Sequence, residues 1–290
     1  MKSAPYRRLN ISPLRYPGGK GALWVRLRQL VRDSGLAGCT YVEPYAGGVG
    51  AGLSLLVTGQ VDHVVINDLD PAIHAFWQSL VKSPDLLIDK ILTTPLDVTE
   101  WRRQKRVYSS GQADLDALAF STFFLNRTNR SGILNGGPIG GLDQTGNYKI
   151  DARFDRNKLA DRIRLLKLYA PNITVSCKDG VDVIAEYAER PDTFIYADPP
   201  YFEKAGSLYM NSFRAEDHED LARTLNAVAD ATWLLTYDNV AAVHRLYPER
   251  RRRLFGLFYS ANGAARASEI AVLSDAMADI GEGWPISTSA

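Results

Sequence analysis

Short apolar segments typical of buried strands alternate with helical segments along much of the chain. The predicted strands cover residues 41–45, 61–67, 173–177, 193–197 and 233–237. Predicted helices at 180–189 and 216–230 separate the later strands, and a glycine-rich turn at 46–52 leads into a helix between the first two. This alternation predicts an α/β fold with a Rossmann-like, doubly wound sheet.

The end of the chain departs from this alternation. Two strand-like segments, 250–259 and 268–274, are separated only by a loop of small residues. They predict an antiparallel hairpin at the far edge of the sheet.

The middle of the chain is mostly helical and basic. Between Trp101 and Lys167 there are nine Arg and four Lys against six Asp and no Glu, and a Gly/Asn-rich stretch at 126–147 interrupts the helical pattern. We therefore expect an inserted helical domain at 73–170, between two parts of one α/β domain at 1–72 and 171–290. Such a cation excess suits a phosphate-binding surface, although the same charges could form solvated helix faces.

The composition excludes several classes of protein. The chain has 290 residues, 46% of them hydrophobic, with 34 Lys and Arg against 33 Asp and Glu, which is typical of a folded protein with a sizeable core. Cys39 and Cys177 lack the spacing of a metal site or a disulfide framework, which fits a reducing compartment. No apolar run approaches the ~20 residues of a membrane span, and the first residues lack the apolar core of a signal peptide. We expect a cytoplasmic protein with no metal and no membrane partner.

A glycine-rich turn, from Glu43 through Gly47 to Gly50, follows the first predicted strand. Glycines let a ligand approach the backbone while the next helix presents its N-terminus. Asp68 ends the second predicted strand, where an acid can bind the two hydroxyls of a ribose. This order of elements predicts a nucleoside site, whereas a glycine turn alone could serve only tight packing. The glycine spacing differs from G-x-G-x-x-G and so disfavours NAD and FAD.

A second glycine-containing motif, at 15–20, precedes this unit. Its Lys20 is followed by Gly21, not by the Ser or Thr of a phosphate-binding P-loop. Two interpretations remain open. Tyr16 and Lys20 could close over a ligand from outside the sheet, or the turn could only start a helix.

The sharpest chemical signal is Asp198-Pro199-Pro200-Tyr201, directly after the apolar strand at 193–197. Ligands of open α/β sheets bind beyond strand ends of this kind. The prolines stiffen the turn and have no N–H, so that backbone carbonyls can accept hydrogen bonds from a substrate amine. With an acid and a stacking aromatic beside them, this arrangement suits methylation of an exocyclic nitrogen. The alternative is a polar turn with a packed tyrosine.

Taken in order, these motifs resemble the Dam-like family of adenine-N6 DNA methyltransferases, which use S-adenosylmethionine. The resemblance rests on 16–20, 43–50, 67–68 and 198–201, and extends to a Leu-Asn-Arg segment at 125–132 and to 236–239 and 246–247. It implies a methyltransferase sheet with an inserted DNA-recognition domain, and methylation of the N6 amino group of an adenine flipped out of double-stranded DNA. Two alternatives are methylation of another planar amine (cytosine N4, an RNA base or a protein amide) and an inactive DNA-binding relative.

The resemblance also implies roles for individual residues. The residues implied to contact S-adenosylmethionine are Tyr16, Lys20, Glu43, Gly47, Asp68, Asp179 and Asp198. The catalytic residues implied are Asp198, which holds the target amine, with Pro199 beside it and Tyr201 stacked on the base. For the DNA contacts, we expect Arg127, Arg130 and Lys149 to bind phosphates. Asn129, like Asn126 and Asn135, could read base edges or only shape the loop.

Overall fold

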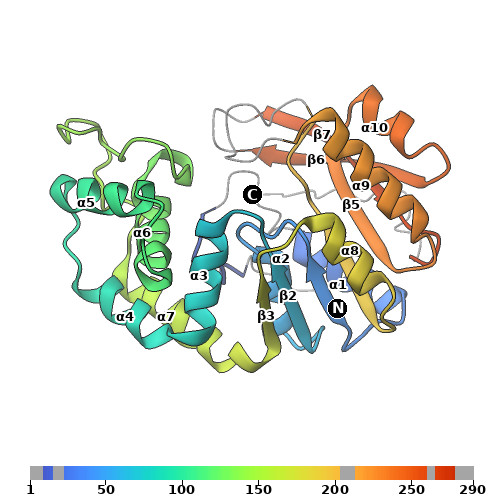
Figure 1. The fold of residues 1–290 in the computed structure, drawn as a ribbon, viewed down its shortest axis with the longest axis horizontal. Coiled ribbons are helices and arrows are strands. Elements are labelled where there is room, and N and C mark those ends of the chain that lie inside the picture. Colours follow the sequence, from blue (N-terminus) through green and yellow to red (C-terminus); the bar gives the residue numbers. More distant parts are fainter. Residues whose placement is uncertain (1–8, 16–22, 203–212, 260–264, 278–290) are drawn as a thin grey trace, which may run out of the picture.

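The computed structural model describes residues 9–15, 23–202, 213–259 and 265–277 (Figure 1). Its strands are β1 (Thr40–Glu43), β2 (His63–Asn67), β3 (Ile173–Ser176), β4 (Thr193–Ala197), β5 (Trp233–Asp238), β6 (Arg251–Tyr259) and β7 (Ala265–Leu273). They form one seven-stranded sheet in the order β3-β2-β1-β4-β5-β7-β6. The first five strands in this order pair in parallel. The predicted α/β sheet is confirmed at this level.

The last two strands form the antiparallel hairpin that the sequence predicts. β7 pairs antiparallel with both β5 and β6, so that β6 is the outer strand of the sheet. Because β7 is antiparallel to β5, its residues near Glu269 lie beside the carboxyl end of β5, where Glu269 is opposite Asp238. The hairpin therefore contributes to the edge of the sheet at which the parallel strands end.

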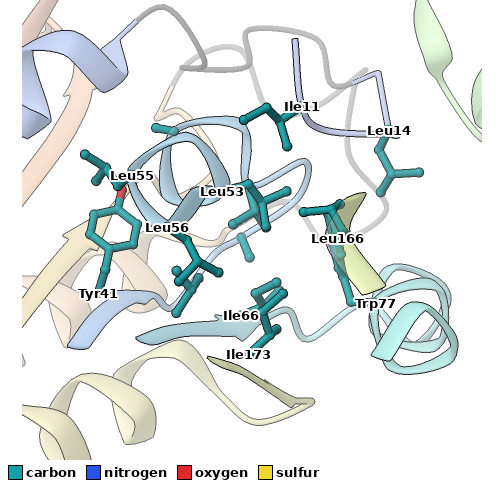
Figure 2. Packing of buried hydrophobic residues seen from close by; sticks show 14 of the residues in the cluster. Ile11, Leu14, Tyr41, Leu53, Leu55, Leu56, Ile66, Trp77, Leu166 and Ile173 are labelled. Carbon is teal, nitrogen blue, oxygen red and sulfur yellow. The ribbon is translucent and has the colours of Figure 1, made fainter. Parts of the chain in front are cut away.

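Helices cover both faces of the sheet. Alternate strand residues divide between two apolar clusters: Tyr41 and Val64 belong to one, and Val42 and Val65 to the other. The first cluster includes α1 (Trp24–Asp33) and α2 (Gly50–Val57), and the second includes α8 (Gly180–Ala188), α9 (Ala215–Ala227) and α10 (Ala241–Leu246). Figure 2 shows the leucines of α2 packed against Tyr41 and Ile66 of the sheet. No helix in the described ranges is long and apolar enough to cross a membrane.

Five α-helices lie between β2 and β3 in the chain and gather at the β3 edge of the sheet (Figure 1). We call them the helical group: α3 (Pro71–Lys82), α4 (Pro84–Thr93), α5 (Val98–Ser109), α6 (Leu115–Thr128) and α7 (Arg156–Leu168). Four of them begin at an aspartate whose side chain accepts a hydrogen bond from a first-turn amide, which satisfies a donor that the helix itself leaves unpaired. These capping residues are Asp70, Asp97, Asp114 and Asp155.

The helical group shares an apolar core with the sheet. Trp77 of α3 and Leu166 of α7 belong to the same buried cluster as Ile66 and Ile173 of the sheet (Figure 2). Trp77 and Leu166 are fully buried. The helical group is therefore packed directly onto the sheet by apolar contacts.

Candidate active site

Three acids meet at one edge of the sheet. Glu43 ends β1, Asp68 directly follows β2, and Asp198 directly follows β4. Because β2, β1 and β4 are parallel neighbours in this order, their carboxyl ends lie together. The structure thus brings together the acids of the three motifs that lie within its described ranges, at the edge where open α/β sheets bind ligands.

Glu43 is a carboxyl group held almost out of contact with solvent. Its side chain is 6% exposed, and its Oε1 accepts a hydrogen bond from the Gly52 amide at 3.3 Å. Only a glycine fits there, because a Cβ on Gly52 would lie 2.8 Å from the ring of Tyr41 and 3.1 Å from Glu43 Oε1. The pKa of Glu43 is raised to about 8: burial is the largest cause, the negative charge of Asp198 adds to the rise, and the Gly52 amide opposes it.

Asp68 is bonded to the glycine-rich turn. Its Oδ2 accepts a hydrogen bond from the Gly47 amide at 2.9 Å, and its Oδ1 accepts one from the Asp70 amide at 2.9 Å. Burial raises the pKa of Asp68 to about 6, although both amide bonds lower it. On its other side the turn is held by Trp77, whose Nε1 donates to the Gly47 carbonyl at 2.8 Å. Gly47 has φ +48°, a conformation that glycine adopts without strain.

Asn67 organises the loops around Asp68, a role that the sequence analysis missed. Its Nδ2 donates to the carbonyls of Pro44 at 2.9 Å and Lys178 at 3.0 Å, and its Oδ1 accepts from Ser176 Oγ at 2.8 Å and from the Lys178 amide at 2.9 Å. This fully buried amide thereby joins the β1 turn to the loop before α8. The signal available in the sequence was a polar residue ending an otherwise apolar strand, which must find partners if it is buried.

Asp179 lies in that same loop. Its side chain is exposed and accepts a hydrogen bond from the Val181 amide at 3.0 Å, so that it caps the N-terminus of α8. The next residue, Gly180, is packed against Tyr45, since a Cβ there would lie 2.3 Å from the Tyr45 ring. Asp179 is therefore held near the β1 turn by backbone contacts, at the β2–β3 side of the site.

The Asp198 carboxylate is oriented by β5. Thr236 Oγ1 donates to Asp198 Oδ1 at 2.8 Å, and the Tyr196 and Thr236 hydroxyls lie 3.0 Å apart. Pro199 is buried, while Asp198 and Tyr201 are half-buried. The Tyr201 hydroxyl donates to Glu269 Oε1 on β7 at 2.5 Å. Thr236 thus positions Asp198, and Glu269 positions Tyr201. The sequence analysis missed Glu269, because it lies 68 positions from Tyr201 and no local pattern connects the two.

Two residues expected among the DNA contacts are inside the protein: the phosphate role of Arg127 is corrected, and for Asn129 the structure favours the alternative that it shapes the loop. Arg127 is 7% exposed, and its guanidinium donates to the Pro13 carbonyl. Asn129 is fully buried; its Oδ1 accepts from Trp101 Nε1 at 2.7 Å, and its Nδ2 donates to the carbonyls of Ile133 and Leu134. Side chains occupied in this way within the protein are not available to phosphates or bases.

The other two predicted DNA contacts lie on the surface. Arg130 and Lys149 are exposed, and Lys149 Nζ donates to the Gln144 carbonyl at 2.5 Å within its own loop. On α5, Arg102 and Arg106 are also exposed. Tyr16 and Lys20 lie outside the described residues, but residues 12–15 directly before them are described.

The residue types at the site suit an organic cofactor with hydroxyl groups and positive charge. No group of three His, Cys, Asp or Glu side chains that could hold a metal ion occurs in the described ranges. A carboxylate has about four acceptor positions, and the described hydrogen bonds to Asp68 use two of them. The buried Glu43 supplies a carboxyl group that a nearby cation would ionise.

Comparisons relate most of the chain to known proteins. A family model described as D12 class N6 adenine-specific DNA methyltransferase matches residues 16–257. Among solved structures, the crystal structure of protein LPL1258 from Legionella pneumophila str. Philadelphia 1, of family DUF519, is similar to the chain with 11% sequence identity and a TM-score of 0.34, over 88% of this chain and 85% of that one. No curated protein matches the chain.

Proposed function

The chain belongs to the family of D12 class N6 adenine-specific DNA methyltransferases, and from this premise we propose that the acids ending β1, β2 and β4 carry its reaction. The protein is an enzyme that methylates the N6 amino group of adenine in DNA, with S-adenosylmethionine as methyl donor. Methylation of another amine, or loss of activity, is not favoured. The observation that carries the site assignment is the convergence of Glu43, Asp68 and Asp198 at one sheet edge.

The proposed cofactor site lies over the glycine turn. Asp68 would bind the ribose hydroxyls with its remaining acceptor positions, and Gly47 lets the nucleoside approach the backbone. Glu43 would face the methionine end of the cofactor, whose positive charge would stabilise the ionised form of the Glu43 carboxyl group. Asp179 would lie toward the adenine ring of the cofactor, and Tyr16 and Lys20 would contact S-adenosylmethionine.

The proposed catalytic group is Asp198 with the turn that follows it. When bound, S-adenosylmethionine would supply an electrophilic methyl group to the N6 nitrogen; the S–CH3 bond would break, S-adenosylhomocysteine would leave, and the amine would lose one proton. The Asp198 carboxylate, oriented by Thr236, would accept an N–H of the target amine, and the Pro199 carbonyl offers a second acceptor. Tyr201, oriented by Glu269, would stack on the flipped base. Catalysis is then mainly positioning of the amine against the methyl group.

The direct test is incubation of the protein with unmethylated double-stranded DNA and S-adenosylmethionine, followed by nucleoside mass spectrometry. We expect 6-methyladenine, confined by sequencing to one short motif. Methylcytosine as the product, or methylation of RNA in preference to DNA, would overturn the proposed substrate.

We further propose that residues 73–170 act as the DNA-recognition domain, inserted between the two catalytic segments 1–72 and 171–290. Exposed cations on α5 and after α6, including Arg102, Arg106, Arg130 and Lys149, would contact the phosphates of double-stranded DNA and fix its register. These contacts would offset the cost of flipping the adenine, which is about a few kcal/mol.

Arg130→Ala tests this surface. If Arg130 contacts a phosphate, its removal weakens DNA binding by a similar factor for all sequences and reduces the slope of log K against log salt by about one. The measurement is fluorescence anisotropy of labelled duplex over a series of salt concentrations. Arg223→Ala is the matched control, because Arg223 is an exposed arginine on α9 in the catalytic part, with its side chain 75% exposed. An unchanged salt slope in Arg130→Ala would remove this residue from the DNA interface.

The raised pKa of Glu43 predicts that cofactor affinity depends on pH. Its pKa in the free protein is raised to about 8, so that most of the free protein carries a protonated Glu43 at pH 6–7.5. If the cofactor ammonium or sulfonium lies beside Glu43, binding requires loss of this proton, and affinity rises with pH by up to about tenfold per unit in this window. Calorimetry in buffers of different ionisation enthalpy would detect the released proton.

Glu43→Gln is the control for this effect. The variant keeps the shape and one acceptor oxygen but has no proton to lose, and its cofactor affinity should be nearly flat between pH 6 and 7.5. The same pH dependence in wild type and Glu43→Gln would place the methionine end of the cofactor away from Glu43.

A further inference from the structure

Residues 12–15, which we call the leading segment, lie between the glycine turn and the helical group. On one side, Ser12 Oγ donates to the Gly48 carbonyl at 2.5 Å. On the other side, Arg162 Nη1 of α7 donates to the Ser12 carbonyl at 3.0 Å, and Arg127 Nε of α6 donates to the Pro13 carbonyl at 2.6 Å. The leading segment is thus hydrogen-bonded both to the glycine turn and to the helical group.

Asn126 of α6 pairs with the end of this segment as a neighbouring strand would. Its Oδ1 accepts from the Arg15 amide at 2.7 Å, and its Nδ2 donates to the Arg15 carbonyl at 2.7 Å. The same Nδ2 donates to the Gly132 carbonyl at 3.0 Å. Gly132 is closely packed here, because a Cβ on it would lie 2.8 Å from the Arg15 carbonyl oxygen. Only an amide side chain both donates and accepts in this way, so Asn126 specifies the position of Arg15.

The charges around the buried Arg127 guanidinium do not stabilise the folded protein. Its guanidinium is buried, and in the described part of the chain the charges acting on it are those of Arg162 and Arg15, which are also positive. Burial first, and then these two arginines, lower the pKa of Arg127 to about 9. An apolar residue of similar volume at a buried position of this kind is often neutral or more stabilising. The arrangement therefore serves the placement of a backbone better than it serves the stability of the fold.

The leading segment contacts the glycine turn, over which we place the cofactor under the proposed function. We propose that Asn126 and Arg127 are positioning residues for methyl-donor binding: they fix the backbone of the leading segment and thereby hold it in place against the glycine turn. This inference rests on the proposed cofactor site at the glycine turn. It gives the Leu-Asn-Arg segment at 125–127 a function in cofactor binding although it is part of the helical group.

The test uses the full chain without DNA and S-adenosylhomocysteine as the probe, with affinity measured by calorimetry. Asn126→Asp has the same shape, but it replaces the donor to two carbonyls with an acceptor. We expect its Kd for the probe to rise by about tenfold or more, equivalent to the loss of at least one buried hydrogen bond. At saturating cofactor, kcat should stay within about threefold of wild type, so that the change appears in the KM for S-adenosylmethionine. Arg127→Lys retains a cationic donor and should have a smaller effect.

Ser79→Ala is the matched control. Ser79 Oγ donates to Asp116 Oδ1 at 2.7 Å and joins α3 to the other end of α6, away from the leading segment. This variant loses a partly buried hydrogen bond to the same helix, α6, and should have a lower melting temperature, with an unchanged Kd for the probe. If Asn126→Asp does not fold, Ser12→Ala tests the same segment from the glycine-turn side, and its Kd should also rise.

Two results would overturn the inference. One is a wild-type Kd in folded Asn126→Asp or Ser12→Ala together with a lower melting temperature, which would make the contacts merely structural. The other is an equal loss of affinity in Ser79→Ala. In both cases wild type still binds the probe and methylates DNA, whereas failure of the proposed function would appear in the wild-type protein itself.

Discussion

Asp198→Ala is expected to lower kcat for DNA methylation by about 10³-fold, a loss comparable to removal of one preorganised polar group from an active site. The substitution removes the acceptor proposed to hold the target amine in line with the methyl group. Since Asp198 is half-buried at a turn and not part of either apolar cluster, the fold should remain. The measurement is transfer of labelled methyl groups to duplex DNA under saturating conditions, with circular dichroism as a check of folding.

Asp230→Asn provides the control for Asp198. Asp230 is an exposed acid after α9 in the same part of the chain, and its neutralisation changes net charge without touching the site. We expect wild-type kcat in this variant. Substantial methylation by Asp198→Ala would show that the amine is held by other groups, and the catalytic assignment would then be withdrawn.

Asp68→Ala is expected to raise the Kd for S-adenosylmethionine by about 10²–10⁴-fold. Hydrogen bonds to a charged acceptor contribute about 1.5–3 kcal/mol each, and the proposed ribose contact has two of them. The substitution also removes the acceptor of the Gly47 amide, which loosens the turn. Equilibrium binding without DNA isolates this effect from any change in DNA affinity.

The raised pKa of Asp68, about 6, also predicts the direction in which cofactor affinity changes with pH. Wild-type affinity for the cofactor should fall more steeply with decreasing pH below about 6, because protonation of Asp68 then adds to that of Glu43. Asp68→Ala should retain the dependence due to Glu43 and lack this additional steepness. Asp62→Ala is the matched control: this exposed acid lies directly before the amino end of β2, away from the site, and its loss should leave Kd unchanged. Equal weakening by both variants would contradict the ribose assignment.

The parts of the fold that local pattern determines were predictable. The strand Thr193–Ala197 has the predicted bounds, because an unbroken apolar run ends at an acid and two prolines. The hairpin follows from two strand patterns separated by a short loop. The expected strand at 61–67 begins two residues late, at His63. Val61 is buried in the core although it precedes the first residue that pairs in the sheet. An apolar pattern shows that a residue is buried, but it does not show whether the residue belongs to a strand or to the loop before it.

The burial of Arg127 and Asn129 could not be read from the basic composition of the middle segment. Arg127 bonds to a carbonyl 114 positions away, and composition treats buried and exposed arginines alike. Helical periodicity did contain a signal, since Phe120, Phe124 and Arg127 follow the i, i+4, i+7 spacing of one helix face and both phenylalanines are buried. A cation that continues an apolar helix face into the core needs an internal partner, because arginine is almost never fully buried without one.

If the helical group recognises DNA as proposed, the apolar core that it shares with the sheet limits how target specificity could be transplanted between related enzymes. A cassette exchange of all five helices would remove Trp77 and Leu166 from the apolar cluster that they share with the sheet and would detach the Gly47 carbonyl from its indole donor. A foreign module would have to reproduce those surfaces before it could recognise any base. Grafts confined to the surface loop that contains Arg130 and Lys149 leave this packing intact, so the loop is the rational unit for engineering new recognition sequences.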